Sequence, residues 1–137
     1  MFVEIEWSWI EDDDPRWQDQ YCLYSYLHPT REWLLYLGKA DYATVRQRTY
    51  GEHKRELLDA ITAEYDVDHL RAMHGGLLLP DGTRRTSELL SDIESLLIMR
   101  LQPRWNTQSR QSRIARPGLR VQCTGDWPFT RARFHDT

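Results

Sequence analysis

The sequence predicts an α/β fold in which a small, mainly antiparallel central sheet is flanked by helices. Two runs of aromatic and branched residues, 21–27 and 33–37, are separated by a turn-forming loop, which is typical of a β-hairpin. Farther along, apolar residues recur at helical spacing over 87–101. The 137 residues, 40% hydrophobic and 12% aromatic, suffice for one core and leave no room for a second independent domain. We therefore expect a single domain over 1–137.

Charge is distributed unevenly along the chain. The net charge of -3 argues against a general nucleic-acid binder, but acidic residues collect in an N-terminal extension over 1–20 and arginines in a C-terminal extension over 107–137. No apolar run approaches the roughly 18 residues of a membrane span, and the first residues show no signal-peptide pattern. We expect no membrane partner and a cytoplasmic location. The candidate phosphate contacts for DNA are Arg104, Arg110, Arg113 and Arg116, although a solvated arginine-rich end is the simpler interpretation.

The first strand is expected over 2–7, where apolar and acidic residues alternate as in an edge strand. A β-hairpin with a five-residue loop follows. Opposed residues in an antiparallel pair have numbers with a constant sum, and closing this loop pairs Leu27 with Trp33. The same register places Tyr24 directly opposite Tyr36.

Helices are expected after the hairpin. Asp41 is a good N-cap for a short helix over 42–50, on which Arg46 and Tyr50 are four residues apart and share a face. Gly51 interrupts this helix. The elements expected beyond it are a helix with a stripe of Leu57, Leu58, Ile61 and Tyr65, a strand over 67–73 in a unit ended by Gly75 and Gly76, a strand over 77–79, a helix from Thr86 or Ser87 to about Leu101, and a short strand over 119–123.

Glu94 stands out on the helix predicted over 87–101. Leucine and isoleucine side chains define the buried arc of this helix, and Glu94 projects at the edge of that arc rather than opposite it. The simplest interpretation is a boundary glutamate whose carboxylate reaches water. A carboxylate is also an ordinary ligand for a divalent metal.

Several features in a fixed order carry a resemblance to a known family. They are Cys22-Leu23-Tyr24, Tyr36-Leu37-Gly38 followed by Lys39, Arg46 ten residues after Tyr36, Glu94, and Pro103-Arg104-Trp105-Asn106. Over 21–106 the chain resembles the GIY-YIG nuclease family, and its motifs are most similar to the N-terminal incision domain of the excision-repair nuclease UvrC. It departs from the family at Cys22, where glycine is usual, and at 77–85, which looks like an added hairpin or loop.

The resemblance implies a role for each residue. Glu94 would bind the divalent metal, Mg²⁺ or Mn²⁺, together with water and a substrate phosphate. Tyr24 would be the general base, with Lys39 and the metal lowering the pKa of its phenol, or a metal-bound hydroxide would act alone. Arg46 would donate paired hydrogen bonds to phosphate. Tyr36 would position the water or a phosphate oxygen, Tyr50 would add a donor, and Asn106 would fix the active-site loop or the metal ligands by side-chain hydrogen bonds.

The implied function is a metal-dependent endonuclease that hydrolyses DNA phosphodiester bonds one strand at a time, leaving 5′-phosphate and 3′-hydroxyl ends. DNA repair, restriction and mobile-element processing are all compatible settings. A symmetric homodimer is the simplest way to cut both strands, because one site handles one strand. The alternative is a catalytically weak module of the same fold that binds DNA or a protein partner, which the net negative charge favours.

Overall fold

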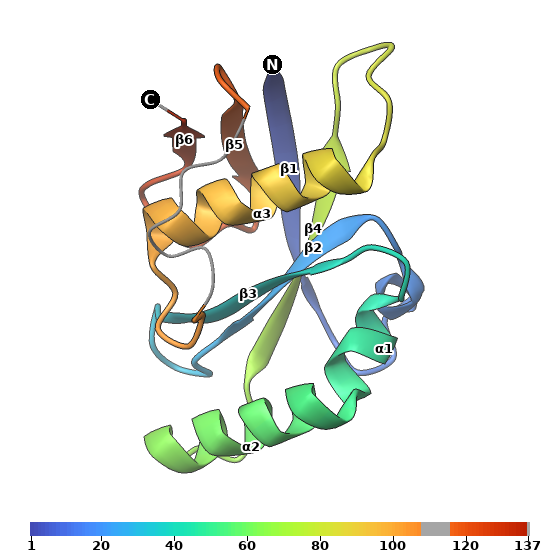
Figure 1. Ribbon diagram of the computed structural model, residues 1–137. Coiled ribbons are helices and arrows are strands. Elements are labelled where there is room, and N and C mark those ends of the chain that lie inside the picture. The colour runs from blue at the N-terminus through green and yellow to red at the C-terminus, as the bar shows by residue number, and fades with distance from the viewer. Residues whose placement is uncertain (108–115, 137) are drawn as a thin grey trace.

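The fold is organised by a six-stranded sheet with the strand order β3-β2-β4-β1-β5-β6 (Figure 1). The computed structural model describes residues 1–107 and 116–136. Its strands are β1 (Phe2–Ile10), β2 (Cys22–Leu27), β3 (Leu34–Ala40), β4 (Arg71–Leu78), β5 (Arg120–Gly125) and β6 (Arg133–His135). Its helices are the short 3-10 helix η1 (Pro15–Gln18), α1 (Val45–Tyr50), α2 (Glu52–Tyr65) and α3 (Ser87–Leu101). The fold is thus mixed α/β, as predicted, but the sheet is larger than a hairpin with a third strand.

The sheet is mixed because β1 and β5 run parallel, whereas the other neighbouring strands are antiparallel. β1 lies between β4 and β5, so the prediction of an edge strand near the N-terminus is wrong. An alternating pattern suits both edge and interior strands of a sheet with one buried face, so it does not distinguish them. The segments expected as terminal extensions supply β1, β5 and β6 and complete the sheet.

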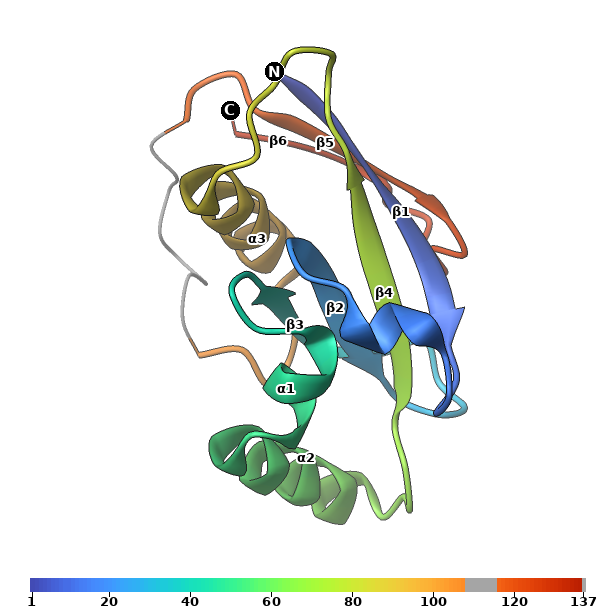
Figure 2. The same ribbon diagram turned by 90° about the vertical axis from the view of Figure 1, so that its right-hand side faces the viewer.

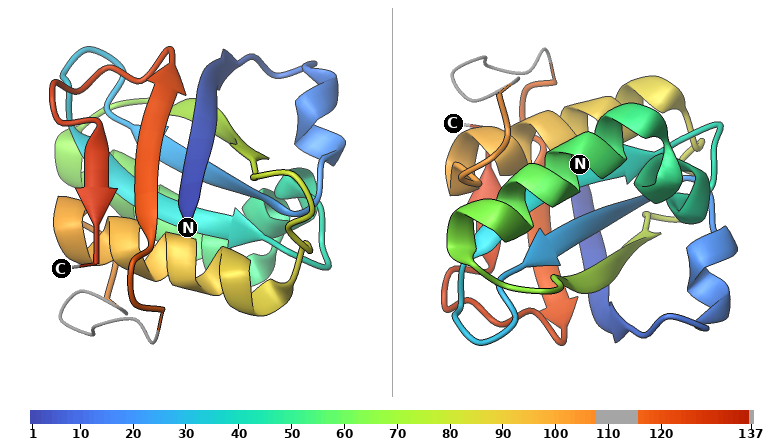
Figure 3. Two further views of the ribbon diagram at one scale, coloured as in Figure 1. Left: turned by 90° about the horizontal axis from the view of Figure 1, so that it is seen from above. Right: turned by 90° about the horizontal axis from the view of Figure 1, so that it is seen from below.

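β3 lies between two layers of helix. The sheet curls so that this edge strand has α3 on one side and α1 with α2 on the other (Figures 1 and 2). Seen from above, α3 lies in front of α2, and seen from below, α2 lies in front of α3 (Figure 3). Leu23 and Leu37 pack in the core that contains α3, whereas Tyr24 and Tyr26 join a smaller cluster with Val45 of α1. A site at this edge can therefore receive side chains from both layers.

The predicted hairpin forms, but its register differs from the prediction. Tyr24 pairs with Gly38, and Tyr36 pairs with Tyr26. Tyr24 is therefore diagonal to Tyr36 rather than directly opposite, with 6.4 Å between the ring centroids. Because side chains alternate along a strand, a shift of two residues leaves both phenols on the same face.

The register shift arises next to the hairpin loop. Leu27 pairs with Leu34 rather than with Trp33, so the loop is longer than predicted. An irregularity after Tyr26 then skips Leu35 in the pairing. A bulge of this kind adds one residue to one strand only and changes every pairing beyond it.

The boundaries of two other elements differ as well. α1 begins at Val45 rather than at residue 42, because its cap is Thr44 and not Asp41; Thr44 forms a reciprocal capping box with Gln47. β4 continues through the glycines that were expected to end it. A Cβ at Gly75 would lie 3.0 Å from Trp7, so close packing explains that glycine. α2, α3 with its Thr86 cap, and β5 agree with the prediction to within a few residues.

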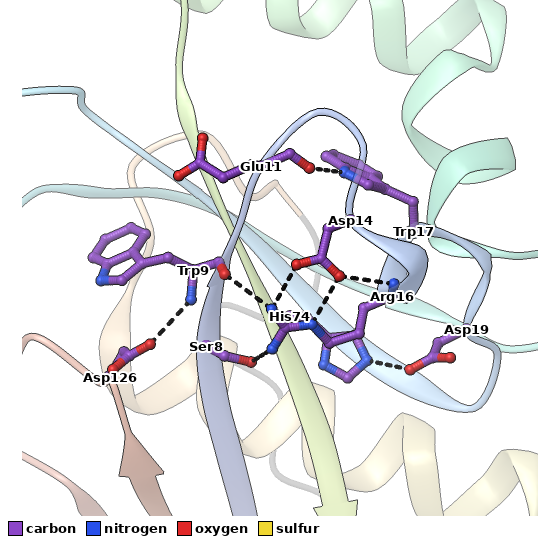
Figure 4. Close-up of polar contacts among 9 residues, drawn as sticks. All are labelled: Ser8, Trp9, Glu11, Asp14, Arg16, Trp17, Asp19, His74 and Asp126. Carbon is purple, nitrogen blue, oxygen red and sulfur yellow. Dashed lines mark hydrogen bonds and ion pairs between the residues drawn. The ribbon is translucent and has the colours of Figure 1, made fainter.

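The acidic segment between β1 and β2 is tied to the sheet (Figure 4). Arg16 of η1 donates two hydrogen bonds to the Asp14 carboxylate, at 2.9 and 2.6 Å, and a third to Ser8 of β1. Asp19 pairs with Nε2 of His74 on β4 at 2.9 Å. These contacts hold the segment against β1 and β4.

Candidate active site

A pocket of about 380 Å³ opens at the β3 edge and is lined from five elements. The two helical layers meet there across a strand that has no side chain at Gly38. The lining includes two phenols, three cationic side chains and one buried carboxylate. They are Tyr24 of β2, Tyr36 and Lys39 of β3, Arg48 of α1, Lys54 of α2 and Glu94 of α3.

Glu94 is buried, with 6% of its surface exposed. The interpretation of a boundary glutamate that reaches water is therefore wrong. Burial raises the pKa of its carboxyl, while the positive charges of Lys39, Lys54 and Arg48 and the Lys39 backbone amide oppose the rise. Lys39 is held in turn by a hydrogen bond from its Nζ to Ser91 on α3. A buried carboxylate among three cations is costly to maintain for stability alone, and it marks this pocket as a candidate site.

Tyr24 is the most enclosed of the predicted site residues that the structure describes, with 2% of its surface exposed. Its ring lies over Gly38, where a Cβ would come within 2.5 Å of the phenol Cζ. Burial raises the pKa of the Tyr24 phenol, and the neighbouring Tyr36 and Tyr26 raise it further. Arg48 opposes this rise, but burial outweighs it.

Tyr36 has a partner that the sequence analysis did not identify. Nζ of Lys54 donates a hydrogen bond to the Tyr36 hydroxyl at 2.5 Å and lies 3.8 Å from the centroid of its ring. Burial lowers the pKa of Lys54 to about 8, although Glu94 opposes this. Burial and Glu94 both raise the pKa of Tyr36. No sequence pattern marks Lys54, which reaches the pocket because α2 begins directly after Gly51 and its first turn lies there.

The arginine in the pocket is Arg48 and not the predicted Arg46. Val45 and Thr49 form the buried stripe of α1 and fix the rotation of the helix. At about 100° per residue, Arg48 and Arg46 then lie on opposite flanks of that stripe. Arg46 is instead placed over the ring of Tyr50, 5.4 Å from its centroid. Tyr50 is 60% exposed and lines a different cavity, so neither member of this predicted pair reaches Glu94.

Asn106 forms side-chain hydrogen bonds to β3, whereas the resemblance implied bonds that fix the active-site loop or the metal ligands. Its Oδ1 accepts from the Leu37 amide at 2.9 Å, and its Nδ2 donates to the Leu37 carbonyl at 2.8 Å. The amide of Trp105 donates to the Leu35 carbonyl at 2.8 Å. This segment therefore occupies the free edge of β3 and positions Tyr36, which lies between the two anchored residues.

The predicted DNA contacts have different environments. Arg104 is exposed and stacks over Trp33, with Cζ 4.1 Å from the ring centroid. Arg116 is half-buried, and its Nε binds the carboxylate of Asp92 on α3 at 2.7 Å. Arg110 and Arg113 lie outside the described residues.

Comparison of the chain with models of protein families, with curated proteins and with solved structures finds no match. The resemblance to GIY-YIG nucleases therefore rests on the motif residues themselves. Within residues 1–107 and 116–136, no helix is both long and apolar enough to cross a membrane.

The pocket fits a divalent metal only together with an anionic substrate. In the part of the chain that the structure describes, no three histidine, cysteine or acidic side chains are grouped to hold a metal. Glu94 supplies one buried carboxylate, and three cations surround it. A phosphate can contribute further oxygen ligands and offset the positive charge, as is usual for Mg²⁺ held by one or two carboxylates.

Proposed function

We propose that this protein is a metal-dependent endonuclease of the GIY-YIG type that hydrolyses DNA phosphodiester bonds one strand at a time, leaving 5′-phosphate and 3′-hydroxyl ends. The observation that carries the proposal is the position of Glu94. It is a buried carboxylate facing two phenols and three cations in one pocket at the β3 edge. Phosphodiester hydrolysis needs this combination of metal ligand, proton acceptor and anion-binding groups.

The cationic side chains of the pocket bind and orient the substrate phosphate. Arg48 presents a planar guanidinium, which can donate two parallel hydrogen bonds to phosphate oxygens. Lys39 supplies a second positive charge from the other side of β3. Glu94 holds the divalent ion, Mg²⁺ or Mn²⁺, which supplies Lewis-acid activation and neutralises phosphate charge when bound.

Tyr36 with Lys54 is better placed than Tyr24 to move the proton. Tyr36 is the less enclosed phenol, and its hydroxyl already contacts Nζ of Lys54. A lysine with a pKa near 8 is neutral in part of its population at physiological pH and accepts a proton from the phenol. The Tyr36 oxygen then takes a proton from the attacking water, while Tyr24 packs behind it and fixes its ring.

A nicking assay on supercoiled plasmid tests the proposal. We expect nicked circles with Mg²⁺ or Mn²⁺ and none with excess chelator. Glu94→Gln keeps the shape of the side chain and loses the charge, so it should abolish nicking. Glu88→Gln, an exposed glutamate in the first turn of the same helix, is the matched control and should nick normally.

Two outcomes would contradict the nuclease proposal. Normal nicking by Glu94→Gln would show that the metal lies elsewhere. DNA binding without any nicking, at either metal ion, would support the weakly catalytic binding module instead. The plasmid bands distinguish single-strand nicks from linear product, and hence one cut strand from two.

A further inference from the structure

A second cavity, of about 290 Å³, adjoins the catalytic pocket. The two hollows share Tyr36, His53 and Lys54 as lining residues, so they are contiguous at the two groups proposed to move the proton, Tyr36 and Lys54. We call the second hollow the flanking cavity. Its remaining lining is an aromatic ring, an aliphatic side chain and two polar residues, namely Trp105, Leu57, Asn106 and Thr107.

Trp105 is held in place on several sides. Its indole Nε1 donates to the Tyr65 hydroxyl at 3.2 Å, and its backbone amide donates to the Leu35 carbonyl at 2.8 Å. The next residue, Asn106, is fixed to Leu37 by two hydrogen bonds. These bonds fix the Trp105 ring at the flanking cavity, so ligand binding there costs little conformational entropy of this side chain.

Positive charge continues beyond Trp105. Arg104 and Arg31 are both exposed and both lie over the ring of Trp33, at 4.1 and 4.9 Å from its centroid. Lys54 lines the flanking cavity, and Arg104 directly precedes Trp105 in the chain, with its amide bonded to the Leu34 carbonyl of β3. This order of cation, aromatic ring and cation suits a nucleic-acid strand, in which phosphates alternate with bases.

We propose that the flanking cavity binds one unpaired nucleobase next to the scissile phosphate, with Trp105 as its stacking surface and Arg104 as a contact to the following phosphate. A base inside a duplex is stacked on both faces, so only a base that has left the stack can enter a side cavity. The preferred substrate is then DNA that is single-stranded or locally unpaired at the cut. This inference rests on the proposed nuclease function.

An abasic residue tests the inference directly. The protein with Mg²⁺ cuts an end-labelled single-stranded oligonucleotide, and a matched oligonucleotide carries a single tetrahydrofuran residue in place of one nucleoside. The products are resolved at single-nucleotide resolution. We expect cleavage to fall about tenfold at one phosphate on one side of the abasic residue, because one stacked base is lost, and to be unchanged two or more positions away.

Variants assign this footprint to Trp105. Trp105→Leu should cut both oligonucleotides equally at that phosphate, whereas Trp105→Phe keeps an aromatic face and should retain the footprint. Trp127→Leu is the matched control, because Trp127 is also half-buried but packs against Trp7 and Phe129. Melting temperatures of all variants separate loss of stacking from loss of fold.

The outcomes distinguish this inference from the function on which it rests. Metal-dependent cleavage with no abasic footprint would contradict base binding in the flanking cavity, but the proposed nuclease function would stand. Faster cleavage of a fully paired duplex than of the single strand does the same. A footprint that Trp105→Leu retains assigns the base to another surface and also overturns the inference. Absence of cleavage on every DNA overturns both proposals.

Discussion

The ring of Tyr24 lies over Gly38 on the neighbouring strand, so close that a Cβ at position 38 would stand 2.5 Å from the phenol Cζ. Gly38 is not among the glycines with positive φ, so its backbone does not require glycine. Glycine is required because the Tyr24 ring fills the space that a side chain at position 38 would occupy. The tyrosine of one strand and the glycine of the other therefore form a single packing unit, which lines the pocket.

Gly38→Ala should displace Tyr24 and distort the pocket. We expect a loss of about 1–3 kcal/mol in the free energy of unfolding, because a methyl group is forced into a filled space. Urea denaturation measures it, and plasmid nicking should fall further than the stability does. Gly76→Ala is the control, since its nearest neighbour, at 3.5 Å, is an ordinary contact. A fully active, stable Gly38→Ala variant would disprove this packing.

Arg48→Ala and Arg46→Ala form a matched pair on one short helix. Arg48 lines the pocket and Arg46 does not, so only Arg48→Ala should reduce nicking, on the order of 100-fold for a lost contact to the developing charge. Single-turnover rates at saturating metal measure the difference. A larger effect of Arg46→Ala would contradict this assignment. It would favour Arg46, which was selected by its spacing of ten residues from Tyr36.

Lys54 should impose a pH dependence on cleavage. Its pKa is lowered to about 8 by burial, and the groups that influence it are Glu94 of α3 and Arg48 of α1. Neutral Lys54 accepts the Tyr36 proton, so the rate should rise as pH increases through about 8. Lys54→Met should be slower and lack this rise. If the pH–rate profile of Lys54→Met kept the same inflection, Lys54 would not be the group that accepts the proton.

Glu94→Gln should stabilise the fold while abolishing cleavage. The pKa of Glu94 is raised above its ordinary value of 4.5, so the folded state favours the protonated form. The wild type therefore loses stability, relative to the glutamine variant, as pH rises from about 4.5 through the raised folded pKa. Thermal unfolding of both proteins, without metal, should converge at low pH and diverge at neutral pH. The opposite order would mean that the surrounding cations outweigh burial.

Asn106→Ala should loosen the β3 edge. It leaves the amide and carbonyl of Leu37 without their partners, at a cost of about 1–3 kcal/mol for each buried group. Hydrogen exchange at the Leu37 amide should accelerate, and unfolding should occur at lower urea. Thr107→Ala, an exposed neighbour, should leave both measurements unchanged. Unchanged exchange at Leu37 would show that the side chain of Asn106 does not anchor the strand.

Part of this structure could be predicted from local sequence patterns. The aromatic runs around the hairpin and the apolar stripe of α3 gave the right elements, because their periodicity reflects one buried face each. Glu94 was identified from its place on that stripe. The register was not predictable, since the longer loop and the bulge at Leu35 each shift it by one residue, and together they move the partner of Tyr24 from Tyr36 to Gly38.

Other features depend on tertiary contacts that spacing does not encode. Counting residues from Tyr36 selected Arg46, whereas the burial of Val45 turns Arg48 toward the pocket. Lys54 reaches Tyr36 only because α2 folds back after Gly51. The parallel pairing of β1 with β5 joins segments that are far apart in the sequence, and no local sequence pattern predicts it.

That pairing sets the order in which the protein can be completed during synthesis. β1 is synthesised well before β5, and its Phe2 pairs with Arg120, which lies 118 residues later in the chain. Until then one side of β1 presents unpaired backbone groups, the kind of edge through which nascent chains aggregate. Glu4 and Glu6 lie on this strand, and the acidic run at 12–14 follows it. Their negative charges would keep unfinished chains apart until β5 arrives.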